Sequence, residues 1–138
     1  RMRIRLLLEC ENFSLSSYSV SSVDIYGVPG RTFTNNGWGS DTRAWTQVFK
    51  GSTACDTDPY SDMICGTGDT VTYAAIYIND DNAYSSETYR EALIAHELGH
   101  AGGLRHQSYL SGTIMDAQLS LGTDVTAYDV NQTQALYP

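Results

Sequence analysis

The sequence predicts an α+β fold, in which a small β-sheet is followed by two helices. Residues 20–28 and 70–78 are rich in β-branched and aromatic side chains, which favour strands. Residues 88–102 and 126–137 instead place apolar side chains at helical spacing. With 138 residues the chain is large enough to bury a core. We therefore expect residues 1–138 to form a single domain.

The first half of the chain also contains two segments with weaker patterns. The strand predicted at residues 20–28 ends at Pro29 and Gly30, both of which interrupt strands. Residues 31–39 are rich in turn-forming residues and predict a connection. Residues 41–50 fit either a short helix or a strand, because the spacing of their apolar side chains suits both.

Both predicted helices begin with the pattern of a capping box. In this arrangement a Ser or Thr and an acidic residue three positions later bond each other's main chain. Thr88 and Glu91 show the pattern in the first helix, and Thr126 and Asp129 show it in the second. These pairs predict where the two helices start.

The first of these helices and the segment after it contain three histidines in a regular pattern. His96 and His100 are four residues apart, so a helix presents them on the same face. Two imidazoles so placed can bind one Zn²⁺, with Glu97 beside them as a base that is not a ligand. Gly103 can adopt a positive φ, which would end the helix and return the chain with His106 as a third ligand. Three protein ligands leave one position open, as in catalytic zinc sites.

The histidine pattern has two alternative interpretations. The chain has 3 histidines, all within this segment, and they could instead be core residues paired with carbonyls or carboxylates. A different third ligand is also conceivable. No glutamate follows Glu97, but Asp124 could take that position and would leave His106 without a role. The full spacing favours His106 as the ligand.

The long motif H-E-x-x-H-x-x-G-x-x-H, with Met115 nine residues beyond His106, resembles the metzincin clan of zinc endopeptidases, and its matrixin-like members in particular. The resemblance implies a metzincin-like zincin domain. Such a domain has a small twisted mixed β-sheet with an antiparallel edge strand, an active-site helix and a C-terminal helix. Met115 would belong to a Met-turn, as an apolar floor beneath the metal. The long tryptophan-containing helix of the clan has no match here, which implies a reduced or truncated N-terminal part.

The resemblance also assigns roles to the strands. It favours a strand at residues 41–50 and places the strand at residues 70–78 at the antiparallel edge of the sheet. An extended substrate could pair with the main chain of such an edge strand. The residues that would line the substrate are Ala74, Ala75, Ile76 and Tyr77.

The function implied is that of a secreted zinc-dependent endopeptidase. A zinc-activated water would attack the peptide bond of a protein or peptide substrate, with Glu97 as the general base. The alternative is a catalytically inert, zinc-stabilised module that binds peptides with the same fold. Glu97 argues against this alternative, since a structural zinc needs no base and prefers four protein ligands.

Composition restricts the partners and the location. The net charge is −8 with only 8 Lys and Arg, which argues against nucleic acid and anionic membranes as partners. No apolar run is long enough for a membrane span. The acidic chain, with 10 tyrosines and Lys50 as its one lysine, favours a secreted enzyme, which we expect to be a monomer.

Two further features of the sequence suggest a disulfide bond and a calcium site. Cys55 and Cys65 flank a polar loop and could form a disulfide, leaving Cys10 over, although buried thiols are the alternative. The oxygen-rich residues 79–82 could bind Ca²⁺, although such clusters are more often turns.

Overall fold

The computed structural model describes residues 22–55, 71–82, 86–107, 112–116 and 125–136. These residues fall into two compact units. One contains the described residues up to 82 and holds a β-sheet, and the other contains those from 86 onward and holds two helices. No helix within these ranges is long and apolar enough to cross a membrane.

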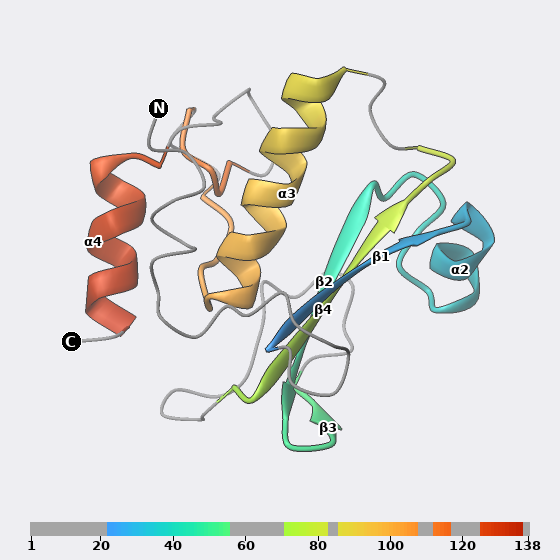
Figure 1. Ribbon diagram of the computed structural model, residues 1–138, viewed down its shortest axis with the longest axis horizontal. Helices are drawn as coiled ribbons and strands as arrows, with labels where there is room; N and C mark the ends of the chain where they lie inside the picture. Colours follow the sequence, from blue (N-terminus) through green and yellow to red (C-terminus); the bar gives the residue numbers. More distant parts are fainter. Residues whose placement is uncertain (1–21, 56–70, 83–85, 108–111, 117–124, 137–138) are drawn as a thin grey trace. The chain divides into compact units, whose positions relative to one another are not determined.

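Four strands form one mixed sheet (Figure 1). They are β1 (Val23–Val28), β2 (Ala44–Lys50), β3 (Thr53–Ala54) and β4 (Tyr73–Asn79). Their order across the sheet is β1-β4-β2-β3, with β4 parallel to β1 and antiparallel to β2. β2 is also antiparallel to β3. The predicted α+β class with a small mixed sheet is confirmed, and β1, β2 and β4 lie in the three segments predicted as strands.

β4 lies inside the sheet. Ala74 is paired with Val23 on one side and with Val48 on the other. The prediction that the strand at residues 70–78 is the antiparallel edge strand is therefore wrong, because β1 and β2 occupy both of its sides. Residues 74–76 are at most 2% exposed, so both faces of the strand are covered as well. A continuous apolar run of this kind is typical of a strand inside a sheet.

This position removes the backbone pairing with substrate that was expected of β4. That pairing needs a strand whose main chain is open on one side, and neither side of β4 is open. The residues to which the role was assigned are Ala74, Ala75, Ile76 and Tyr77. They contribute instead to the interior of the sheet.

One face of the sheet is aromatic. Tyr77 of β4 stacks on Tyr26 of β1, with 5.5 Å between the ring centroids. Trp38 stacks on Trp45 of β2 at 5.5 Å and tilts against Tyr77 at 5.0 Å. Rings from three strands and from the connection before β2 therefore hold this face together, since aromatic pairs at these distances add to the free energy of burial.

A short helix, α2 (Gly30–Asn35), follows β1 (Figure 1). The prediction of an irregular connection at residues 31–39 is therefore wrong in its first half. Phe33 of α2 is fully buried and meets Trp38 edge-on at 5.3 Å. The main-chain N–H of Gly30 donates to Oδ2 of Asp81 at 2.8 Å, so a carboxylate from the end of β4 satisfies the first residue of the helix.

The acidic segment at residues 79–82 is held by contacts with the main chain. Asn79 is fully buried, its Nδ2 donates to the carbonyl of Thr42 at 2.8 Å, and its Oδ1 accepts from the N–H of Asp81 at 3.1 Å. Nδ2 of Asn82 donates to the carbonyl of Ser40. These hydrogen bonds show that the polar side chains of residues 79–82 stabilise a turn. Calcium binding at this turn stays a prediction.

The second unit contains α3 (Glu87–Ala101) and α4 (Ala127–Leu136). α3 begins after Ser86, so the capping box predicted for Thr88 is wrong. The capping box at α4 is confirmed. The N–H of Thr126 donates to Oδ2 of Asp129 at 2.8 Å, and the N–H of Asp129 donates to Oγ1 of Thr126 at 3.3 Å.

Cys55 is disulfide-bonded. Its partner lies outside the described residues, as do Cys10 and Cys65, so pairing with Cys65 stays a prediction.

Candidate metal centre

Two turns of α3 and the chain that follows them bring the three histidines together. His96 and His100 lie one helical turn apart on α3. Gly103 has a φ of 86°, a value that side chains other than glycine rarely adopt. The N–H of Gly103 bonds the carbonyl of His100, and the N–H of Leu104 bonds that of Gly99, both at 2.9 Å. The chain therefore reverses at Gly103, and His106 returns beside the helix.

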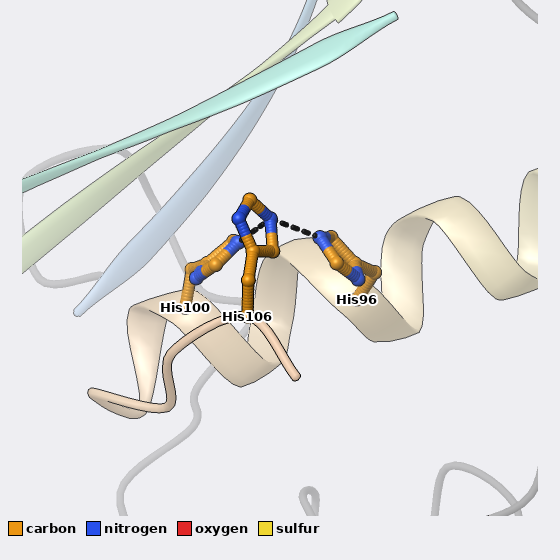
Figure 2. Close-up of side chains that lie close together, drawn as sticks. All are labelled: His96, His100 and His106. Carbon is orange, nitrogen blue, oxygen red and sulfur yellow. Dashed lines mark hydrogen bonds between the residues drawn. The ribbon is translucent and has the colours of Figure 1, made fainter. Parts of the chain in front are cut away.

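The three imidazoles point toward a common centre (Figure 2). Nε2 of His106 lies 3.0 Å from Nε2 of His96 and 3.0 Å from Nε2 of His100. Zn–N bonds of about 2.0–2.1 Å in a tetrahedral site separate two nitrogens by about 3.3 Å. Among the described residues this is the one group of histidine, cysteine and acidic side chains whose ligand atoms could hold a metal. The geometry fits a zinc ion after a shift of a few tenths of an ångström.

Main-chain carbonyls orient two of the rings. Nδ1 of His96 donates to the carbonyl of Ile114 at 2.7 Å, and Nδ1 of His100 donates to the carbonyl of Leu104 at 2.9 Å. A carbonyl only accepts, so the proton of each neutral ring is on Nδ1 and the lone pair is on Nε2. Both lone pairs are thereby directed to the centre of the site, as in metal sites whose outer contacts fix the histidine tautomer.

Burial keeps both rings neutral. It lowers the pKa of His96 to about 4, although the bond to Ile114 opposes the shift. Burial likewise lowers the pKa of His100 to about 3, and the neighbouring His96 and His106 lower it further. The rings are therefore neutral at neutral pH, with Nε2 free of a proton, which is the form that binds metal ions.

Glu97 and Met115 both lie in the second unit and are buried. Glu97 follows His96 on α3 and is 5% exposed. Met115 is 1% exposed and belongs to an apolar cluster with Leu104 and Ile114. A side-chain carbon built on Gly99 would lie only 2.3 Å from Sδ of Met115. The methionine therefore packs directly on α3, between the turns that carry His96 and His100.

Several contacts that support the site have no signature in the sequence. Gln107, next to His106, donates its N–H to the carbonyl of Met115 at 2.8 Å. The hydroxyl of Tyr128 in α4 donates to Oε1 of Gln107 at 3.0 Å. The buried carboxylate of Asp116 acts on His96, whose pKa it raises in opposition to burial. A carbonyl acceptor has no sequence signature, because every residue carries one.

The remaining candidate residues belong to the other unit or lie outside the described residues. Residues 74–77 belong to β4 in the other unit. Asp124, the alternative third ligand, lies outside the described residues.

Comparison with known proteins agrees with this geometry. A family model described as "Dual-action HEIGH metallo-peptidase" matches residues 50–133, which is more than half of the chain. Residues 96–100 read HELGH, one residue different from the five letters of the family's name. No curated protein and no solved structure matches the chain. On the strength of the family match and the histidine site within it, the chain belongs to the HEIGH metallopeptidase family.

Proposed function

We propose that the chain is a secreted zinc endopeptidase of matrixin-like, metzincin type. Its metal ligands are His96, His100 and His106, and its general base is Glu97. The observation that carries the proposal is the convergence of three imidazoles, two of them with Nδ1 held by carbonyls, in a chain of a metallopeptidase family. The substrate is a protein or peptide.

The chemistry divides between the ion and the chain. Zinc bound by the three rings supplies a Lewis acid that polarises a carbonyl and lowers the pKa of a water to about 7. The carbonyls of Ile114 and Leu104 hold two rings so that their lone pairs face the ion. Glu97 accepts a proton from the attacking water and delivers it to the leaving amine.

Met115 fits the proposed Met-turn. Its thioether packs against Gly99 and its side chain is almost fully buried in an apolar cluster. In this role Met115 supports the helix that carries His96 and His100 and does not bind the metal.

Secretion is supported by one structural observation. Cys55 is disulfide-bonded, and disulfides persist mainly in oxidising compartments outside the cytosol. The acidic, lysine-poor composition fits the same location.

The rival proposal is an inert module in which the metal only stabilises the fold. A structural zinc site usually has four protein ligands, whereas this group contains three histidines among the described residues. A structural zinc also needs no general base, whereas the buried Glu97 directly follows the ligand His96 on α3.

Replacing Glu97 separates the two proposals. We expect Glu97→Gln to bind zinc like the wild type and to lose hydrolysis of a quenched-peptide panel by at least about 100-fold, the usual contribution of a general base. Glu91→Gln is the matched control, because Glu91 is an exposed residue of the same helix. If the wild type binds zinc and is as inactive as Glu97→Gln, the binding module is the correct reading.

A further inference from the structure

We propose that Gly99 is a positioning residue for the metal centre. Its lack of a side chain lets Met115 approach α3 closely enough for the neighbouring carbonyl of Ile114 to reach His96. The inference rests on the proposed zinc site and adds a residue that is neither a ligand nor a base.

The space at Gly99 is already filled by the methionine. A β-carbon at this position would lie 2.3 Å from Sδ of Met115 and 3.6 Å from Cδ1 of Ile114. Ordinary van der Waals contact begins at 3.4 Å, so the sulfur would have to retreat by about 1.1 Å (3.4 minus 2.3). Gly99 therefore sets how deeply the segment of Met115 sits against the helix.

The sulfur lies near the flexible end of its side chain, but the packing around it restricts where it can move. Met115 is 1% exposed and is among the largest fully buried side chains of the described residues. It packs with Leu104 and Ile114, and with the partly buried Ala95 and Val125. Close-packed interiors respond to added volume by moving the backbone or straining side chains. A methyl group at Gly99 would therefore push the turn that carries Met115 outward.

The residue next to Met115 makes the contact that orients His96. The carbonyl of Ile114 accepts from Nδ1 of His96 at 2.7 Å. Any outward movement of this turn lengthens that distance and weakens the bond. Without the acceptor, the ring of His96 would lose its fixed tautomer and orientation. Loss of such an outer partner typically weakens metal binding about 10–100-fold.

The test is a double-mutant cycle in zinc affinity. Chelator competition with Zn²⁺ is measured for the wild type, Gly99→Ala, Met115→Ala and the double variant. We expect Gly99→Ala to weaken zinc binding about 10–100-fold in the wild-type background. In the Met115→Ala background the same change should have less than about a threefold effect, because the sulfur with which the methyl group collides is gone.

Gly102→Ala is the matched control. Gly102 ends the same helix with a φ of −80°, and the nearest atoms to its added carbon are main-chain oxygens of Gly99 and Leu98, at 3.3 and 3.5 Å. It does not meet Met115, so zinc affinity should stay within about threefold of the wild type. The visible spectrum of the Co²⁺-loaded protein gives a second readout, which should change in Gly99→Ala and return in the double variant.

Each remaining outcome is decisive. The proposal is wrong if Gly99→Ala binds zinc like the wild type, if Gly102→Ala weakens binding equally, or if the penalty of Gly99→Ala is the same in both backgrounds. It is also wrong if Met115→Ala folds and the double variant does not. If the wild type itself binds no zinc, the proposed function fails. In that case the thermal midpoints of the same four metal-free proteins test only whether a β-carbon at Gly99 collides with Met115.

Discussion

The metal centre and the sheet differ in how far apart along the chain their contacting residues lie. His96 meets His106 across ten residues and the carbonyl of Ile114 across 18. In the sheet, Val23 of β1 pairs with Ala74 of β4, 51 residues later. The centre is therefore built by one short segment around polar groups, whereas the sheet depends on distant segments and apolar burial. Changes of charge, and crowding at Gly99, should act on the metal centre, whereas loss of buried volume and of long-range contacts should act on the sheet.

Acid gives the largest effect that we expect on the metal-free centre. In the folded chain the pKa values of His96 and His100 are lowered from 6.5 to about 4 and about 3, first by burial. The unfolded chain therefore takes up protons first as the pH falls. The stability contributed by these two neutral rings is fully present above pH 6.5 and is lost as the pH falls toward 4 and 3.

Denaturant midpoints of the metal-free protein between about pH 7.5 and pH 5 measure this loss, since few carboxylates titrate there. Replacing both histidines with glutamine should flatten the profile. A wild-type midpoint that does not change over this window would contradict the account, because the rings would then have ordinary pKa values.

Loss of buried side-chain volume should lower stability most in the sheet. Ile76 of β4 is fully buried, and Ile76→Ala should lower the free energy of unfolding by about 2–5 kcal/mol through lost burial and a cavity. Ile25, its parallel partner on β1, is 49% exposed and gives the matched control. We expect Ile25→Ala to have less than half the effect in urea unfolding. Equal effects of the two substitutions would mean that β4 is not the interior strand.

The smallest expected effect concerns a long-range contact in the same unit. Asp81→Ala removes the acceptor for the N–H of Gly30 at the start of α2, and should lower stability by about 0.5–2 kcal/mol. Asp80→Ala is the control, because its exposed carboxylate lies beside Gly27 and not at the helix. In thermal melting, the midpoint of Asp81→Ala should therefore lie below that of Asp80→Ala. Identical melting would show that Asp81 does not stabilise α2.

The same difference in sequence separation explains what could be predicted. The histidine spacing, the reversal at Gly103 and the capping box of Thr126 and Asp129 are local, and their residues alone define them. The strands at residues 20–28 and 70–78 were also predictable, because β-branched and aromatic runs report on a single segment. The residues at 41–50 fitted a helix or a strand equally, and only the family resemblance favoured the strand.

The order of the strands was not predictable in this way. A strand with the composition of residues 70–78 could lie inside a sheet or at its edge. Its interior position is evident only from its pairing with both β1 and β2. The helix α2 was missed because part of its support, the carboxylate of Asp81, comes from 51 residues away. The carbonyls of Leu104 and Ile114 were missed because the main chain of every residue offers the same group.

Zinc binding by the third histidine tests the central claim most directly. Titration of the metal-free protein with Zn²⁺ should show one equivalent bound by the wild type and by Arg105→Ala, an exposed neighbour in the same segment. His106→Ala should weaken binding by at least about 100-fold, since loss of an outer hydrogen-bond partner already costs about 10–100-fold. If His106→Ala binds zinc as tightly as the wild type, the ion is not held by these three rings.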